Sequence, residues 1–275
     1  MKFIPLTCLL LLPSLVSLAG ERETLWPSAM PGPVPAAKPG ADPTGRPLDA
    51  GRVTDVARPT LTWFIPADAD GRVLLVCPGG GYALLAADME GEAVGRRMAR
   101  QGLSVAVLRY RVPCKNPDAD DAAPRLDVAE AIRAAREKMR ALGKAGRQVG
   151  VMGFSAGAHL ALVAAYGPMP QGAARPDFVV AVYPAYLTGP AGDLKAAFAP
   201  AKGAPPACFI HAADDPYSAD GSVLLWRRLR GVGVASELHV FSSGGHGFGL
   251  SEAGQSGPVA PWADLVESWV RRTAR

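Results

Sequence analysis

Short apolar segments alternate with stretches of helical spacing along most of this chain, and this alternation limits the fold more than any other feature. The apolar segments are TLTWFI (60–65), VLLVC (73–77), LSVAVLRY (103–110), VGVM (149–152), FVVAVY (178–183), ACFIHA (207–212) and SELHVF (236–241). Helical spacing is found in 88–101, 126–139 and 222–230, after Ala156 and after Pro261. Strands that are apolar along most of their length are buried on both sides, which predicts an α/β fold with a mainly parallel sheet and helices on both faces.

The length and composition predict one large domain. The chain has 275 residues, of which 49% are apolar and 20% are charged, and α/β domains of this size commonly form a single core. We assign this domain to residues 51–275. The segment 184–206 is rich in Ala, Pro and Gly and is too short for a lid domain, so we expect at most a small flap there.

The first nineteen residues have the composition of a secretory signal peptide. They contain Lys2, an apolar stretch around Leu9–Leu12 and the ending Ser17-Leu18-Ala19, which predicts cleavage after Ala19. A retained membrane anchor is disfavoured because Pro13 interrupts an apolar stretch that is shorter than the ~20 residues needed to cross a bilayer. We therefore expect a secreted or periplasmic protein without stable membrane insertion after cleavage.

Residues 20–50 form a proline-rich segment, with seven prolines between Pro27 and Pro47 and no apolar periodicity. This composition is typical of an extended arm or linker. After removal of the signal peptide, an odd number of cysteines (Cys77, Cys114 and Cys208) is left, so we expect no complete disulfide framework.

The charge distribution argues against nucleic-acid binding. The net charge is +4, but acidic and basic residues are interspersed and form no long basic run. CPGGGY (77–82) fails as a nucleotide loop because it lacks a following Gly-Lys-Ser/Thr and a third Rossmann glycine at Leu84. We expect no cofactor and no metal site, and the sequence leaves the oligomeric state open.

The segment VMGFSAGAHL (151–160) contains one match to G-x-S-x-G, with Ser155 between Gly153 and Gly157. A nucleophilic serine on a sharp turn between a strand and a helix needs small residues two positions away on each side. The neighbouring apolar strand and helix supply that context, which predicts a nucleophile elbow. The alternative is a glycine-bracketed turn in which Ser155 only caps the helix.

A serine nucleophile needs an imidazole base, and the chain has four histidines. His246 follows the last strand in the glycine-rich loop SSGGHGFGL, where the backbone can bring it over the elbow, so we predict His246 as the base. His159, His211 and His239 lie within a helix or strands, and we expect structural roles for them.

The acid of such a triad comes between the serine and the histidine in chain order. Asp214 and Asp215 follow a strand at its carboxyl end, where the sites of parallel sheets collect. We choose Asp215 and keep Asp214 as the second candidate. Asp177, Asp193 and Asp220 are interpreted as solvated caps.

Acyl transfer also needs backbone donors for the developing oxyanion. The Ala156 N–H, at the start of the helix after the elbow, is one candidate, and the glycines of CPGGGY are the other.

Taken in order, PGGGY, DMEG, YRVP, GFSAGAHL, YPA, HAADDP and GGHGFGL resemble the secreted bacterial acetylxylan-esterase-like branch of the α/β-hydrolases, which is related to feruloyl and acetyl esterases. The resemblance runs from about Leu25 to the end. It implies an α/β-hydrolase fold without a large lid domain. It also implies a triad of Ser155, Asp215 and His246 and an oxyanion hole formed by Gly80, Gly81 and Ala156.

The chain departs from these relatives at two places. Ala158 stands where they often have glycine, and the segment after the acid, DDPYSADGS, lacks their Val-Pro element. The second departure is the reason that Asp214 stays a candidate.

Two further residues are candidates for a substrate pocket. Glu90 in the DMEG motif is interpreted either as a helix cap, which we favour, or as a contact to a sugar hydroxyl. Tyr82 is interpreted equally as part of an acyl pocket or of the core.

These observations predict a secreted serine carboxylesterase. The resemblance implies that it hydrolyses small acyl esters, acetyl esters above all, on polysaccharide or sugar substrates. One alternative is a serine peptidase of the prolyl-oligopeptidase type, which normally carries a propeller domain that the residues before position 51 cannot form. The other is a catalytically inactive carbohydrate-binding relative, which would be expected to have lost a triad residue.

Overall fold

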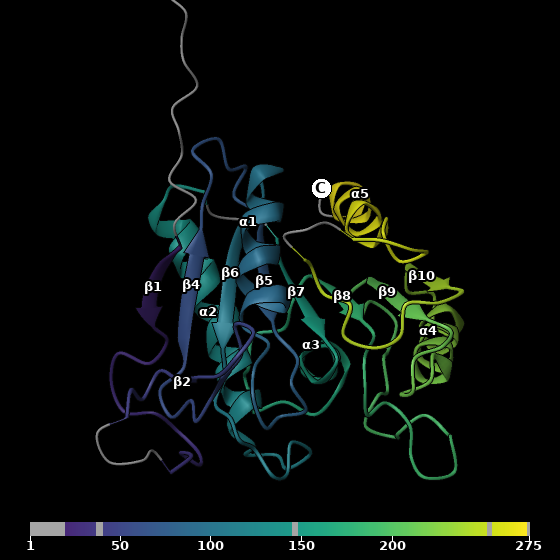
Figure 1. Cartoon of the computed structure of the whole chain (residues 1–275), viewed down its shortest axis with the longest axis horizontal. Coiled ribbons are helices and arrows are strands. Elements are labelled where there is room, and N and C mark those ends of the chain that lie inside the picture. The colour runs from purple at the N-terminus through teal and green to yellow at the C-terminus, as the bar shows by residue number, and fades with distance from the viewer. Residues whose placement is uncertain (1–19, 37–40, 145–147, 252–254, 274–275) are drawn as a thin grey trace, which may run out of the picture.

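A computed structural model describes residues 20–36, 41–144, 148–251 and 255–273. The predicted signal peptide lies outside these ranges. The described chain is built on a twisted sheet of eight strands in the order β1-β4-β6-β5-β7-β8-β9-β10 (Figure 1). The strands are β1 (Glu21–Thr24), β4 (Thr60–Phe64), β5 (Val73–Cys77), β6 (Ser104–Arg109), β7 (Val149–Phe154), β8 (Phe178–Val182), β9 (Ala207–Ala212) and β10 (Ser236–Phe241). The neighbours from β6 to β10 pair in parallel, whereas β4 is antiparallel to both β6 and β1.

Helices cover both faces of this sheet. They are α1 (Ala93–Arg100), which continues from a π-helical turn η1 (Asp88–Glu92), and α2 (Ala123–Ala141), α3 (Ala156–Tyr166), α4 (Asp220–Gly231) and α5 (Trp262–Thr273). Alternate residues of the central strands enter two separate cores. On β5, Leu75 belongs to the core formed with α2, α3 and α4, while Leu74 belongs to the core formed with α1 and α5. The predicted α/β class, with a mainly parallel sheet between helices, is confirmed.

The described part of the N-terminal segment packs on this domain. Strand β1 pairs with β4 at the sheet edge, and the Arg111 guanidinium donates hydrogen bonds to the backbone oxygens of Pro31 (2.8 Å) and Pro33 (2.9 Å). Arg111 is fully buried against the Asp127 carboxylate, at 2.7 Å. Because a buried guanidinium needs acceptors for its remaining N–H groups, the two proline carbonyls complete its hydrogen bonding. A short hairpin of β2 (Arg46–Pro47) and β3 (Val53–Thr54) follows.

The segment 184–206 is a packed loop. It contains an antiparallel bridge between Thr188 and Leu194, and the side chains of Leu187 and Phe198 are buried in the core beside α3 and α4. It adds no separate layer of structure above the sheet.

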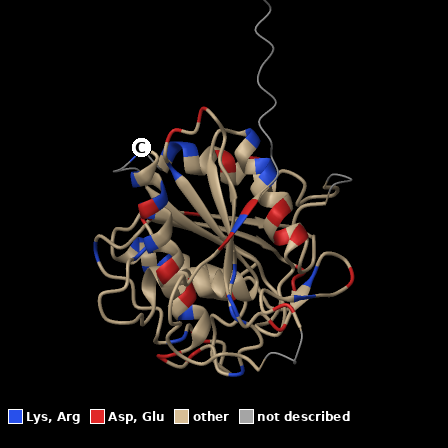
Figure 2. Cartoon of the chain, turned by 90° about the vertical axis from the view of Figure 1, so that its left-hand side faces the viewer, with Lys and Arg blue, Asp and Glu red and all other residues tan. Residues whose placement is uncertain are grey.

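Acidic and basic residues are interspersed along the ribbon on the side of the molecule shown in Figure 2. Within the described ranges, none of the helices combines the length and the apolar character that crossing a bilayer requires.

Candidate active site

Ser155 lies on a sharp turn between β7 and α3. Its backbone has φ +51° and ψ −117°, a conformation that is rare for a residue with a side chain. A Cβ atom added to Gly153 would lie 2.1 Å from the backbone oxygen of Gly157, and one added to Gly157 would lie 2.0 Å from the backbone oxygen of Cys77. The glycines on both sides of Ser155 are therefore required by the close approach of α3 to β5 and β7.

The three residues chosen for the triad lie in hydrogen-bonding contact. His246 Nε2 is 2.8 Å from Ser155 Oγ, and His246 Nδ1 is 2.7 Å from Asp215 Oδ2. The other carboxylate oxygen of Asp215 accepts a hydrogen bond from the Tyr217 N–H, at 2.8 Å. Asp215 is buried, which keeps water from competing for the imidazole. This arrangement lets Ser155 pass its proton to His246 while Asp215 orients the ring.

Asp214, the second candidate for the acid, does not face the imidazole. Its Oδ1 accepts hydrogen bonds from the N–H groups of Gly244 (2.9 Å) and Gly245 (2.8 Å). The two neighbouring carboxylates thus have separate tasks: Asp215 contacts the His246 ring, and Asp214 holds the backbone of the loop that carries it.

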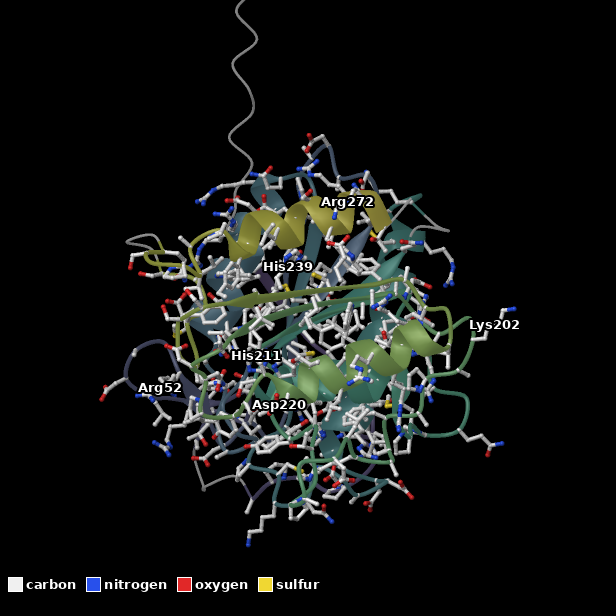
Figure 3. All side chains as sticks on the ribbon, turned by 90° about the vertical axis from the view of Figure 1, so that its right-hand side faces the viewer. Arg52, Lys202, His211, Asp220, His239 and Arg272 are labelled. Carbon is white, nitrogen blue, oxygen red and sulfur yellow. The ribbon has the colours of Figure 1, made fainter. Side chains whose placement is uncertain are left out.

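The remaining histidines have protein partners away from Ser155. His211 lies near the amino end of α4, and His239 lies on β10 (Figure 3). His211 is buried with Nδ1 3.0 Å from Ser222 Oγ, and its Nε2 is 3.3 Å from Asp215 Oδ2. Burial lowers the pKa of His211, so its ring is held neutral beside the acid. The spacing of four residues between His211 and Asp215 was the only sequence signal for this contact.

His159 connects the helix after the elbow to the loop after β5. Its Nδ1 is 2.8 Å from Tyr82 Oη, and burial lowers its pKa to about 4. Tyr82 is itself buried between Tyr110 and His159. Of the two interpretations of Tyr82, the structure supports core packing, because almost none of its surface is open to a substrate.

The glycine-rich loop after β5 lies directly beside the elbow. A Cβ atom added to Gly79 would be 2.9 Å from Ser155 Cβ. The Gly80 carbonyl accepts hydrogen bonds from the N–H groups of Ala83 and Leu84, both at 3.1 Å, which folds the loop back on itself. Gly80 has φ +132°, where glycine is strongly favoured.

The backbone N–H groups predicted to bind the oxyanion are not used in hydrogen bonds within the described part of the protein. Among the described residues, no acceptor is found for the N–H groups of Gly80 and Gly81. Ala156 is the first residue of α3, so its N–H has no partner within the helix. All three groups belong to the two segments that meet at Ser155.

Glu90 has neither of the two roles considered from the sequence. No side chain caps η1 or α1, and Glu90 is only 4% exposed. Its Oε2 accepts a hydrogen bond from the Gly79 N–H (2.7 Å), and its Oε1 accepts one from Tyr183 Oη (2.9 Å). Burial raises the pKa of Glu90, and these two hydrogen bonds oppose that shift. Both oxygens face protein donors, so Glu90 supports the loop after β5 instead of contacting solvent or a helix end.

Tyr183 extends this support to the loop of His246. Its hydroxyl accepts a hydrogen bond from the Gly249 N–H, at 2.9 Å, while donating to Glu90. Its ring packs against the His246 ring, with centroids 5.0 Å apart. The sequence did not indicate this network, because it depends on contacts between segments that are 66 and 93 residues apart.

Within the described ranges, no group of three or more His, Cys, Asp or Glu side chains is arranged to hold a metal ion.

Comparison with known proteins shows which families this chain resembles. The α/β-hydrolase-fold family matches residues 74–197, the range from β5 through the elbow and α3 to the loop after β8. The acetylxylan esterase of Xylanibacter ruminicola is 29% identical over 224 residues, which are 72% of this chain and 45% of that protein. Endo-1,4-beta-xylanase B of Butyrivibrio fibrisolvens is 29% identical over 125 residues, covering 42% of this chain and 20% of that protein. The chain thus spans less than half the length of these two curated relatives.

A solved structure matches over nearly the whole length of both chains. The acetyl ester-xyloside bifunctional hydrolase of Caldicellulosiruptor lactoaceticus superimposes with a TM-score of 0.68 at 29% identity, covering 94% of this chain and 98% of the other. The chain has the α/β-hydrolase fold. More particularly, it is similar to acetylxylan esterases, as the sequence motifs indicated.

Proposed function

We propose that this chain is an exported serine esterase that hydrolyses acetyl and other small acyl esters carried by polysaccharides or sugars. The observation that carries the proposal is the continuous relay from Ser155 Oγ through His246 to Asp215, with heavy-atom distances of 2.8 Å and 2.7 Å. These distances are within the range needed for proton transfer between a nucleophile and a general base.

In the proposed mechanism, Ser155 Oγ attacks the ester carbonyl carbon while His246 Nε2 takes the hydroxyl proton. The N–H groups of Ala156, Gly80 and Gly81 stabilise the oxyanion of the tetrahedral intermediate, each donor being worth about a hundredfold to a thousandfold in rate. His246 then gives its proton to the leaving alcohol, and the acyl group stays on Ser155. In the second half of the reaction, His246 takes a proton from water as the water oxygen attacks the acyl carbon. The bond from the acyl carbon to Ser155 Oγ then breaks, His246 returns the proton to Oγ, and the free acid is released.

The proposed substrate rests on the relatives. One similar protein is named an acetylxylan esterase, and the structure that matches over nearly its whole length is named for acetyl ester and xyloside hydrolysis. Export is proposed from the composition of residues 1–19, whose charged start, apolar centre and Ser17-Leu18-Ala19 ending fit a cleaved signal peptide.

The first test compares the mature protein with Ser155→Ala on p-nitrophenyl acetate. Loss of the attacking oxygen is expected to lower kcat by about a millionfold and to leave only the residual rate enhancement that comes from the oxyanion hole and substrate binding. Ser268→Ala, which changes an exposed serine on α5, is the matched control and is expected to keep full activity.

The proposed export has its own test. The exported protein, sequenced from its N-terminus, is expected to begin at Gly20.

The result that would overturn the mechanism is equal hydrolysis of the acetate by wild type and Ser155→Ala. A peptide amide is measured in parallel. Cleavage of the amide without cleavage of the acetate would favour a peptidase over an esterase.

A further inference from the structure

Two tyrosine side chains stand exposed beside the triad. Tyr217, in the segment after β9, is 50% exposed, and Tyr186, after β8, is 38% exposed. Large apolar side chains elsewhere in the described chain are mostly buried, with Val34, Leu142 and Val240 as the other exposed ones. Exposed aromatic rings gathered at a reactive site commonly mark a binding surface.

The two rings adjoin each other and both parts of the site. Their centroids are 6.1 Å apart with the planes at 75°, so they form a corner. The Tyr217 ring is 4.6 Å from the His246 ring. On the other side, Tyr186 Oη would lie 3.6 Å from a Cβ atom added to Gly81, which places Tyr186 over the predicted oxyanion loop.

The backbone holds both tyrosines in these positions. The Tyr217 N–H donates to the Asp215 carboxylate at 2.8 Å, so the triad acid itself fixes the start of the Tyr217 side chain. Tyr186 has φ +61°, a costly conformation for an aromatic residue that the surrounding structure must stabilise. Strain of this kind collects at functional sites.

The chemistry of the triad indicates which part of an ester meets Tyr217. His246 Nε2 must reach the alcohol oxygen to protonate it as it leaves, so the alcohol part of the ester lies on the imidazole side of the scissile bond. The acyl part lies on the other side of the carbonyl carbon. A ring 4.6 Å from the imidazole is therefore beside the alcohol.

We infer that Tyr217 and Tyr186 form a stacking platform for a pyranose ring, the sugar whose acylated hydroxyl leaves. A pyranose has a face of C–H groups that packs on an aromatic ring, while its hydroxyl groups stay in water at the rim. An exposed tyrosine pair suits such an amphipathic ligand, because each ring offers an apolar face and a polar Oη. The inference rests on the proposed function and adds to it a specific contact for the sugar.

The experiment compares two acetate esters that differ only in the alcohol, a mono-O-acetylated methyl β-xylopyranoside and ethyl acetate. The quantity measured is the ratio of their kcat/KM values. Tyr217→Ala is expected to lower this ratio about tenfold and Tyr186→Ala about threefold, because each loses a stacking ring. Tyr217→Phe keeps the ring and is expected to stay within about twofold of wild type. Leu142→Ala, exposed at the end of α2, is the control for removing an exposed apolar side chain.

If Tyr217 had a purely structural role, Tyr217→Ala would lower kcat/KM equally for both esters and leave their ratio unchanged. That result would overturn the proposal. A second result would also overturn the proposal. In it, Tyr217→Ala would lower kcat/KM for methyl ferulate more than for methyl acetate, while the ratio for the sugar ester and ethyl acetate stayed unchanged. That result would place an aromatic acyl group on the platform.

Binding of xylotriose, which carries no ester, separates this inference from the proposed function. In an NMR titration, Tyr217→Ala is expected to bind about tenfold more weakly than wild type, even if the wild type hydrolysed neither ester. Equal binding by the two proteins, or no binding by the wild type, would overturn the platform whatever the esterase assay shows.

Discussion

The serine elbow and the histidine loop each place one reacting side chain, but they do so by different means. The turn at Ser155 depends on residues next to it in the chain, because Gly153 and Gly157 allow α3 to fold back onto the ends of β5 and β7. The loop of His246 is held by groups from elsewhere: the Asp214 carboxylate, the Tyr183 hydroxyl and the Met89 carbonyl, which accepts the Leu250 N–H at 2.8 Å. The turn that carries the nucleophile is thus marked by its own glycines, whereas the loop that carries the base is held by side chains and backbone groups from distant segments.

The largest of three further effects is expected at the two neighbouring aspartates that contact the histidine and its loop. Asp215→Asn replaces the acceptor of His246 Nδ1 with an amide that favours the wrong tautomer of the ring. We expect kcat on p-nitrophenyl acetate to fall on the order of ten-thousandfold, with the fold intact by circular dichroism.

Asp214→Asn is the matched control for that change. An asparagine carbonyl still accepts from the N–H groups of Gly244 and Gly245, so only the charge of the acceptor is lost. We expect a loss of tenfold or less, on the order of a single weakened hydrogen bond. A greater loss in Asp214→Asn than in Asp215→Asn would contradict the assignment of the triad acid.

The second prediction breaks the elbow. In Gly157→Ala the new methyl group would overlap the backbone oxygens of Cys77 and Pro78, at 2.0 and 2.5 Å, and backbone atoms at the end of a central strand cannot move freely. We expect the free energy of unfolding to fall by more than about 3 kcal/mol, together with the activity.

Gly231→Ala is the control for this substitution. Gly231 lies in the last turn of α4 with nothing within 4 Å of an added Cβ, so alanine is expected to stabilise the helix by up to about 1 kcal/mol. Urea unfolding of both variants measures the contrast. Equal stabilities would show that the elbow does not depend on its glycines.

The sheet and its helices were predictable because each central strand is an apolar segment in its own right, as in VLLVC at β5, and each helix has its own spacing. Strand β1 was not predicted. Its sequence ERET is polar, and it becomes a strand only by pairing with β4, far along the chain.

The same distinction explains the site. The glycines around Ser155 indicate a sharp turn by themselves, and the chain order suggested where an acid and a base should follow. Which of two adjacent aspartates faces the imidazole depends on the direction of the backbone after β9, which the sequence does not reveal. The role of Glu90 was missed for a similar reason, since its two donors, the Gly79 N–H and the Tyr183 hydroxyl, come from other segments.

The smallest of the three effects is expected at Glu90, where the oxyanion loop and the histidine loop are linked. A glutamine at position 90 can accept the hydrogen bond from the Gly79 N–H through its Oε1. Its Nε2 group, however, is a donor and would face the Tyr183 hydroxyl, which is also a donor in this contact. The hydroxyl must turn, and its buried hydrogen then loses its acceptor. We expect Glu90→Gln to lower kcat about tenfold, because a small displacement of the loop weakens the oxyanion contacts.

Tyr183→Phe tests whether both residues act through this one network. It removes the hydroxyl that accepts the Gly249 N–H and donates to Glu90, so the double variant is expected to lose less than the product of the two single losses. Glu137→Gln is the control. Glu137 belongs to an exposed ion pair on α2, so this variant is expected to have a kcat near that of the wild type. If the kcat of the double variant instead fell by the product of the two single losses, the loop after β5 and the loop of His246 would be positioned separately. The histidine loop would then depend on its other contacts, among them those to Asp214, the Met89 carbonyl and Trp262.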